Sequence, residues 1–370
     1  MAESSTGTIN FFQACIIFML MNGLANHVIV NPMILDAAGR DAWLAVLLAG
    51  ALFTAWTMLL IWFMNRSGHR PLKSWLASRT HPAVAWLLVA PLCAQLYLIG
   101  GMTTIHTATW TLANYLPTSP KLLLAVSLAI VCALPPLWGI RPIAILSAFL
   151  LPIVIVLGYF VSFSNMRHKD FTLLSPIAEH GFGPIWNGVL YAGGSFLELV
   201  ALLALQHRIK TKVKPWKMLL FALFSVYVML GPVIGAITEF GPVEASMQME
   251  SPYEQWRLVK LGEYVEHIDF FSIFQWLSGA CIRISLSLYL ILELLTVRRA
   301  GARLGITLGA IASYVLAAML PINEYDFYMW MYRYYFPISL TVMFSAWAAW
   351  MIVALFGKKE RRNADDRPPA

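Results

Sequence analysis

The chain has 370 residues, of which 59% are hydrophobic and only 12% are charged, with a formal net charge of +7. A soluble domain carries about 25% charged residues, so this composition excludes a soluble globular protein and indicates an integral membrane protein. The net positive charge then indicates membrane topology, not nucleic-acid binding. Cys15, Cys93, Cys132 and Cys281 all fall in apolar stretches without metal-ligand or disulfide-framework spacing, so we expect no metal and no cofactor.

Apolar segments of membrane-spanning length follow one another along the chain. About 20 helical residues cross the hydrocarbon core of a bilayer. The sequence therefore predicts an all-α integral membrane protein whose ten transmembrane helices form a single domain over residues 1–370, followed by a disordered cytoplasmic tail at 358–370. The helices are expected near residues 10–34, 42–64, 82–113, 121–138, 141–163, 184–207, 216–239, 270–297, 303–321 and 331–356.

The loops between these helices differ in charge. Most Lys and Arg residues fall on the side shared by both termini, which the positive-inside rule assigns to the cytoplasm. The opposite side is acidic, chiefly because segment 239–269 is rich in Glu. In that segment Trp256, Val259, Leu261 and Val265 recur near helical spacing, which predicts a short amphipathic helix on the outer surface. This helix could be a lid or a connector.

Two of the predicted helices are weakened near their centres. The first contains MNGLANHVIVNP at 21–32, and the sixth contains GVLYAGGSFLELV at 188–200. The second of these lies five helices after the first, which predicts two inverted repeats, at about 10–163 and 184–356, that each begin with a broken helix. A break would expose backbone N–H and C=O groups to a ligand. Small residues also permit close helix packing, so the glycines alone do not decide between the two interpretations.

The predicted ligand site lies between these two helices, with a contribution from the third. In the third helix, residues on opposite faces are polar or small, so both faces are expected to meet protein. An isolated intramembrane histidine is more often a packing residue, which leaves His27 and His106 unassigned. The residues predicted to contact a ligand are Asn22, Gly23, Asn26, Tyr97, Tyr191, Gly193, Gly194, Ser195 and Glu198.

Charged residues inside the predicted helices suggest an ion pair. A charge at the bilayer centre costs at least about 2.5 kcal/mol, so it marks a function or a partner. Glu198 and Arg283 both lie some 20 Å from the outer ends of their helices at about 1.5 Å per residue, so we expect them to pair. The pair could be structural, or Arg283 could replace the coupling ion of a transporter. Glu293 is expected to pair at the interface near Arg298 and Arg299.

Several short motifs carry a family resemblance: GRDAW at 39–43, LPTSPKLLL at 116–124, LLSPIAEHGFGPIWNG at 173–188, FLE at 196–198 and FQWLSGACIRISLSLY at 274–289. In this order they resemble the B-subunit family of spore germinant receptors, or endospore germination permeases. That family is similar to the amino acid, polyamine and organocation transporter superfamily, which implies the five-plus-five fold. The resemblance also implies binding of a small nutrient, commonly an amino acid, in the inner membrane of a bacterial spore together with an A subunit and a lipoprotein C subunit.

Three functional classes remain at this stage. A receptor subunit would bind a nutrient and shift its conformational population. An autonomous secondary transporter, coupled to protons or sodium, would use the same fold. A membrane enzyme is disfavoured because the sequence lacks H-E-x-x-H, G-x-S-x-G, P-loop and paired-carboxylate signatures. The receptor subunit is therefore the expected function and the transporter is the alternative, with no nucleic-acid partner in either case.

Overall fold

Helices make up almost all of the regular structure. The computed structural model describes residues 7–260 and 268–357, so the tail predicted at 358–370 lies outside the described residues. Within them, ten segments are long and apolar enough to cross a membrane, which confirms the predicted number. These segments are Phe11–Ile29, Asn31–Arg66, Pro82–Asn114, Lys121–Trp138, Ile140–His168, Phe182–Arg208, Pro215–Phe240, Phe271–Leu294, Ala300–Ala318 and Glu324–Phe356.

The first helix changes its winding near the middle. α1 (Phe11–Leu24) starts with a capping box, in which the side chain of Asn10 accepts from the Gln13 backbone N–H and the Gln13 side chain accepts from Asn10. It continues into the π-helical turn η1 (Ala25–Ile29), where the N–H of Val30 donates to the carbonyl five residues back, at 3.0 Å. α2 (Asn31–Ala38) then begins with a proline in its first turn, where no N–H is needed.

The sixth segment also changes winding, but not where its glycines lie. α8 (Phe182–Leu197) stays α-helical through 191–195, and the 3-10 turn η5 (Glu198–Ala201) follows it before α9 (Leu202–Leu205) and the 3-10 turn η6 (Gln206–Arg208). The predicted breaks are therefore not confirmed. In π turns and 3-10 turns most backbone N–H and C=O groups still bond within the helix. In an unwound stretch inside the hydrocarbon these groups would have no hydrogen-bond partner. The inverted repeat remains a prediction.

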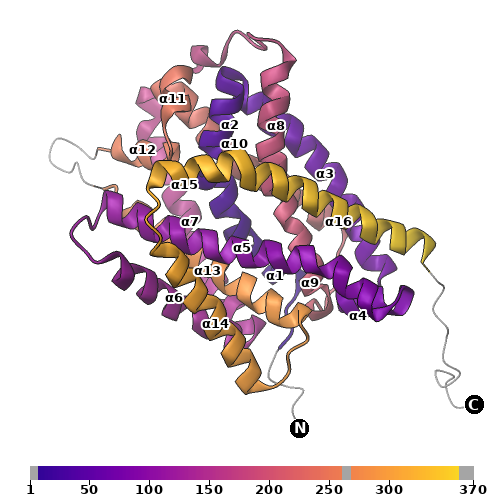
Figure 1. The fold of residues 1–370 in the computed structure, drawn as a ribbon. Coiled ribbons are helices and arrows are strands. Elements are labelled where there is room, and N and C mark those ends of the chain that lie inside the picture. Colours follow the sequence, from indigo (N-terminus) through magenta and orange to yellow (C-terminus); the bar gives the residue numbers. More distant parts are fainter. Residues whose placement is uncertain (1–6, 261–267, 358–370) are drawn as a thin grey trace, which may run out of the picture.

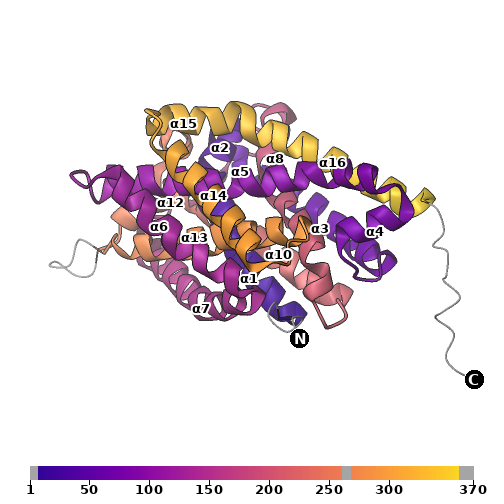
Figure 2. The ribbon, with the colours of Figure 1, turned by 60° about the horizontal axis from the view of Figure 1, so that its bottom comes forward.

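The other elements complete the bundle. Elements η2 to α7 cover the first part: η2 (Gly39–Asp41), α3 (Ala42–Arg66), α4 (Leu72–Arg79), α5 (Pro82–Asn114), α6 (Lys121–Trp138) and α7 (Ile140–Ser164). The later elements are η3 (Asn165–His168), η4 (Phe171–Leu174), α10 (Pro215–Phe240), α11 (Pro242–Met247), α12 (Ser251–Arg257), α13 (Phe271–Leu294), α14 (Ala300–Ala318), α15 (Glu324–Trp330), the π turn η7 (Met331–Tyr335) and α16 (Phe336–Phe356). α13 packs along α5, and α3 packs against both α8 and α10 (Figures 1 and 2).

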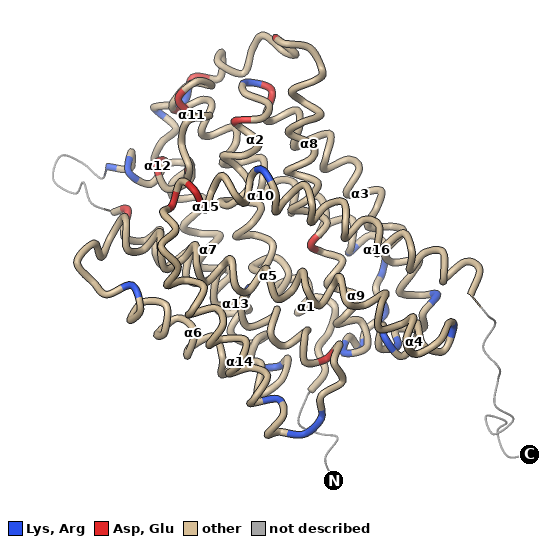
Figure 3. Tube along the Cα trace, in the orientation of Figure 1, with Lys and Arg blue, Asp and Glu red and all other residues tan. Residues whose placement is uncertain are grey.

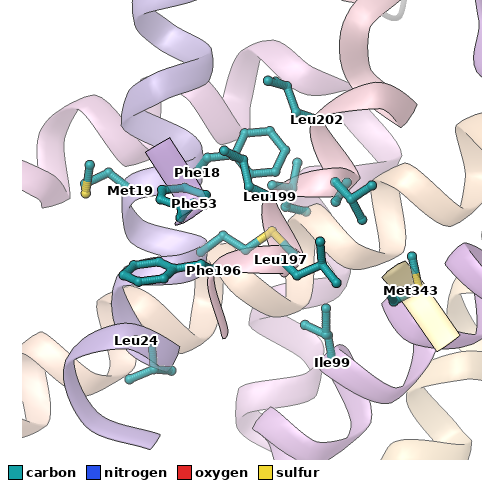
Figure 4. Packing of buried hydrophobic residues seen from close by; sticks show 14 of the residues in the cluster. Phe18, Met19, Leu24, Phe53, Ile99, Phe196, Leu197, Leu199, Leu202 and Met343 are labelled. Carbon is teal, nitrogen blue, oxygen red and sulfur yellow. The ribbon is translucent and has the colours of Figure 1, made fainter. Parts of the chain in front are cut away.

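Close packing positions α8 in the middle of the bundle. A Cβ atom at Gly188 would lie 2.7 Å from the Cβ of Ala45 and 3.0 Å from that of Ala38, so only glycine lets α8 approach α3 and α2 this closely. Further along α8, the ring of Phe196 stacks on Phe53 of α3 with centroids 4.6 Å apart. Figure 4 shows Phe18 beside Leu199 and Leu202 in this part of the bundle, so apolar side chains pack against the apolar residues of η5.

Positively and negatively charged residues concentrate toward opposite ends of the bundle (Figure 3). We call the end that carries α4 and the loop 208–214 the basic end, and the described part of the chain begins and ends on this side (Figure 1). The opposite end carries α11 and α12 with Glu244, Glu250 and Glu254, and we call it the acidic end. This separation follows the loop charges on which the topology prediction depends.

Candidate functional site

The predicted pair of Glu198 and Arg283 forms in the interior. Arg283 donates from Nη1 to Oε2 of Glu198 at 2.6 Å and from Nη2 to Oε1 at 2.7 Å. Both residues are only 3% exposed. A planar guanidinium group matches a carboxylate in this two-bond geometry, which gives the strongest form of such a pair. The pair joins η5 to α13.

Arg283 also reaches the first helix and α5. Its Nη1 donates to the carbonyl oxygen of Met21 at 2.9 Å, and its Nε donates to Oγ1 of Thr103 at 3.1 Å. The N–H of Ala25 bonds to the carbonyl of Asn22, which leaves the Met21 carbonyl for Arg283. The altered winding thus leaves one backbone acceptor free within the helix, and Arg283 of the same chain, not a ligand, occupies it. We call these groups of Met21, Thr103, Glu198 and Arg283 the central lock.

The predicted site residues of the first and sixth segments meet beside this lock. Oγ of Ser195 donates to Oδ1 of Asn26 at 2.6 Å, and Asn26 is only 2% exposed. Asn22, one turn earlier, is 4% exposed, and its Oδ1 is buried without a hydrogen-bond partner in the part of the chain that the structure describes. A Cβ at Gly194 would lie 3.5 Å from the ring of Phe336, whereas one at Gly193 would meet no atom within 4 Å.

Two predicted tyrosines lie apart from these residues. Tyr97 is 41% exposed, and its hydroxyl lies 2.7 Å from Oγ of Ser313 on α14. It therefore lies on the side of α5 that meets α14, away from the first helix. Tyr191 stacks on Tyr332 of η7 with ring centroids 4.7 Å apart. The structure thus groups Asn22, Asn26, Ser195 and Glu198 but not Tyr97 with them.

A cavity of about 190 Å³ lies on the other side of the first helix, in the acidic half of the bundle. Of the predicted ligand residues, Gly23 lines it, and His27 lies one turn further on the same face. A cavity of about 150 Å³ can hold a benzene ring, so this one is large enough for a small organic molecule. Its walls come from α1, η1, α5, α7, α10, α12 and α13 and include Leu20, Gly23, Leu24, His27, Trp110, Leu151, Val154, Gly158, Tyr159, Ser162, Lys169, Phe224, Tyr227, Gly231, Tyr253, Gln255, Trp256, Gln275, Trp276 and Gly279.

Most polar side chains of the cavity wall already have partners. Gln275 accepts from Nε1 of Trp256 at 2.7 Å and donates to the carbonyl of Val154 at 2.9 Å. Lys169 donates to Oγ of Ser162 at 3.0 Å. These bonds leave a surface that is chiefly apolar and aromatic, with Trp110 and Trp276 stacked at 4.0 Å. Such a surface fits the apolar part of a small ligand.

His27 provides one polar contact in this wall. Its Nδ1 lies 3.2 Å from the carbonyl oxygen of Val228. A carbonyl only accepts, so Nδ1 carries the hydrogen and Nε2 of the neutral ring is an acceptor. An N–H or O–H group of a ligand could therefore bond to His27. Its position in the cavity wall therefore favours a ligand-binding role for His27, which the sequence left unassigned.

The predicted surface helix covers the cavity at the acidic end. α12 (Ser251–Arg257) is shorter than the predicted amphipathic segment, whose Leu261 and Val265 lie outside the described residues. Tyr253 and Trp256 of α12 are 8% and 4% exposed, and both line the cavity. Burial raises the pKa of the Tyr253 hydroxyl, which keeps it neutral at physiological pH. α12 thus forms the cavity wall at the acidic end, which we call the roof, and its role as a lid or a connector remains a prediction.

The basic end is closed by a second group of charges. Oε2 of Glu293 lies 2.8 Å from Nε2 of His207 and accepts from Nη2 of Arg208 at 2.9 Å, while Nη1 of Arg303 lies 3.7 Å from Oε1. Glu293 does not pair with the predicted partners Arg298 and Arg299. The 3-10 turn η6 after α9 places His207 and Arg208 next to Glu293 at the end of α13. The chain before α1 is fixed at the same place, since Ile9 and Ile209 form a β-bridge.

Sequence reasoning missed most of the cavity wall. Trp276 and Gln275 lie in the FQWLSGACIR motif, but nothing in that motif distinguishes a cavity residue from a packing residue. The walls from α7 and α10 come from helices whose few polar residues, such as Ser225 and Tyr227 at the centre of α10, show no helical repeat that would mark a cavity face. The position of α12 over the cavity depends on contacts between distant segments. The polarity of the first helix was the one signal that pointed here.

These features define a class of protein: a multi-pass helical membrane protein with a charged lock at its centre and a ligand-sized cavity in one half. The family model described as spore germination protein matches residues 8–326. The chain is also similar to spore germination protein XB of Bacillus anthracis, with 35% identity over 356 residues that cover 96% of this chain and 100% of the relative. The chain belongs to the spore germination protein family.

Proposed function

We propose that this chain is the B subunit of a nutrient germinant receptor. It binds a small nutrient, an amino acid in the first instance, and triggers germination together with A and C subunits. The observation that carries this proposal is the cavity beside the π turn of the first helix, in a chain of the spore germination protein family. The ligand lies against Gly23 and His27, with its apolar part among the aromatic rings.

The central lock gives such binding a route to the rest of the protein. Gly279 of the cavity wall lies one helical turn before Arg283, which bonds to the first helix, α5 and η5. A ligand that bears on this turn changes the preferred position of the first helix relative to α8. Asn22, Asn26 and Ser195 lie along that contact, so they report the shift even where they do not touch the ligand. Binding then changes a conformational population.

The membrane in question is the inner membrane of the spore, with the basic end and both termini in the cytoplasm. The charge separation between the two ends supports this orientation. The cavity then lies in the outer half of the bilayer under α12, where a nutrient from outside can reach it.

A coupled secondary transporter is the second candidate. One observation favours it: the cavity lies in the acidic half, while the Glu293 group closes the basic end, and this asymmetry is typical of one state of an alternating-access cycle. Counterflow of labelled amino acid in vesicles that contain only this chain separates the two candidates. Flux supports the transporter. Saturable binding without flux, together with loss of nutrient-triggered germination when the gene is deleted, supports the receptor.

A thermal-shift screen of the purified chain tests ligand binding directly. Amino acids, sugars and nucleosides are compared at equal concentration. A ligand at 100 times its dissociation constant adds about 2.7 kcal/mol to the free energy of unfolding. We expect stabilisation by one or a few amino acids. If sugars or nucleosides stabilise the chain and amino acids do not, the proposed ligand class is wrong.

A further inference from the structure

A second buried polar cluster lies at the acidic end. Nε2 of His106 on α5 lies 3.1 Å from Oε1 of Glu250, and each side chain is only 9% exposed. The carboxyl group of Glu324, the first residue of α15, lies close enough to that of Glu250 for the two to interact. Nδ1 of His106, Oε1 of Glu324 and Oγ of Ser251 are buried without a hydrogen-bond partner among the described residues. These groups come from three separate elements.

Two carboxyl groups in contact inside a protein do not both ionise, because the two negative charges repel in a medium of low dielectric. One proton shared between them removes the repulsion and supplies the missing hydrogen. Burial raises the pKa of Glu250 to about 8. The groups that face Glu250 are His106 from α5, Glu324 from α15, and Trp110 and Glu254 nearby, of which Glu254 adds further negative charge.

The cluster is connected to the roof of the cavity. Glu250 immediately precedes α12, and its carbonyl accepts from the N–H of Tyr253 at 2.9 Å. The ring of His106 lies edge-on to Trp276 with centroids 5.0 Å apart, and Trp276 lines the cavity. A change in charge at Glu250 therefore acts on α12 and on the cavity wall.

We propose that His106, Glu250 and Glu324 form a proton-binding site that latches α12 over the cavity. With the proton bound, a neutral carboxylic acid donates to its neighbour and holds α12 against α5 and α15. When the proton leaves, the two carboxylates repel and α12 moves away from α15. The cavity then opens toward the acidic end. The proposal depends on the proposed function only in treating the cavity as the ligand site.

Hydrogen exchange on the whole chain in lipid nanodiscs, without ligand, tests this latch. After correction for intrinsic rates, we expect the amides of α12 (Ser251–Arg257) to exchange at least several-fold faster at about pH 9 than at about pH 6. The Glu250→Gln variant, which stays neutral, keeps the slow exchange at both values. Glu179→Gln is the matched control, since it removes a charge from an exposed pair with Arg40 and retains the wild-type response.

If Glu250→Gln does not fold, Glu324→Gln provides the same test, because it removes the other member of the carboxyl pair. The proposal is overturned if α12 exchanges equally at both pH values in the wild type, or if both variants keep the full wild-type response. Because no ligand is present, this result is independent of nutrient binding. If the exchange of α12 depends on pH but the chain binds no nutrient, the latch proposal is supported and the proposed function is refuted.

Discussion

Arg283 binds Glu198 through two hydrogen bonds of 2.6 and 2.7 Å and uses two further donors for Met21 and Thr103. One guanidinium group thereby links the first helix, α5, η5 and α13 at a single level in the bundle. The desolvation of both charges is offset only while every one of these bonds is present. A shift of any of these four elements would break at least one of the hydrogen bonds of Arg283. The central lock therefore couples the positions of the four elements to one another.

Removal of one partner of this pair should be severely destabilising. Glu198→Gln or Arg283→Gln leaves a buried charge without its counter-charge, which costs about 3 to 5 kcal/mol in the free energy of unfolding. The double exchange Glu198→Arg with Arg283→Glu restores opposite charges and should recover part of the loss. Thermal unfolding of the three variants measures this coupling. Equal loss in the double and the single variants would show that charge pairing is not the reason for their burial.

Loss of Glu293 should weaken the closure of the basic end. Glu293→Gln removes the charge that accepts from His207 and Arg208, and hydrogen bonds to charged groups are worth about 2 kcal/mol each. We expect a lower unfolding temperature and faster proteolysis of the loop 208–214. Glu179→Gln, on an exposed pair, should change the free energy of unfolding by less than about 1 kcal/mol. A Glu293→Gln variant as stable as wild type would contradict this role.

Gly188 should not tolerate even one additional methyl group. In Gly188→Ala the new Cβ would lie 2.7 Å from the Cβ of Ala45, and neither atom can move without its backbone. Overpacking of this kind costs about 1 to 3 kcal/mol. Gly305→Ala on α14 meets no atom within 4 Å and serves as the control, since it should be neutral or slightly stabilising. Thermal unfolding of both variants decides whether close packing explains the glycine.

The proton at Glu250 should make stability depend on pH. Its carboxyl pKa is raised from 4.5 to about 8 in the folded chain, so the folded state binds more protons than the unfolded state between these values. Stability is therefore complete below the unfolded pKa and falls as pH rises toward the folded one, by up to about 1.4 kcal/mol per pH unit for one proton. Unfolding temperatures across this range should decline in the wild type and decline less in Glu250→Gln. An unchanged slope in the variant would assign the dependence to other groups.

Composition and apolar length sufficed to predict the membrane class and the number of candidate spans. Both follow from one dominant constraint, since a bilayer requires long apolar helices whatever their packing. The pairing of Glu198 with Arg283 was also predictable, because a buried charge needs a partner and only a few residues lie at the same depth. The glycines of the sixth helix did not locate its change of winding. α8 stays helical at Gly193 and Gly194, and the change lies at Glu198–Ala201, whereas the change in the first helix, at Ala25–Ile29, lies inside the predicted stretch 21–32.

The cavity and the cluster at the acidic end could not be predicted from the sequence. Both depend on which faces of α5, α7, α10 and α13 meet. The polar residues of α5 and α13 show that these helices face protein, but they do not show which neighbouring helix each face meets. Glu250 and Glu324 are 74 positions apart and looked like ordinary loop charges. Tyr97 was predicted to face a ligand because both faces of its helix appeared protected, yet the α14 side leaves it 41% exposed.

Nutrient binding to a chain with a filled cavity tests the central claim most directly. Gly23 lines the cavity, and a Cβ atom at this position would have no neighbour within 4 Å among the described residues, so Gly23→Leu adds a side chain to the cavity without a clash at Cβ. Gly305→Leu on α14 is the control. With the nutrient found by the thermal-shift screen, we expect saturable binding to the wild type and to Gly305→Leu and at least a tenfold loss of affinity in Gly23→Leu, about 1.4 kcal/mol. Equal affinity in a folded Gly23→Leu chain would show that the nutrient does not bind in this cavity.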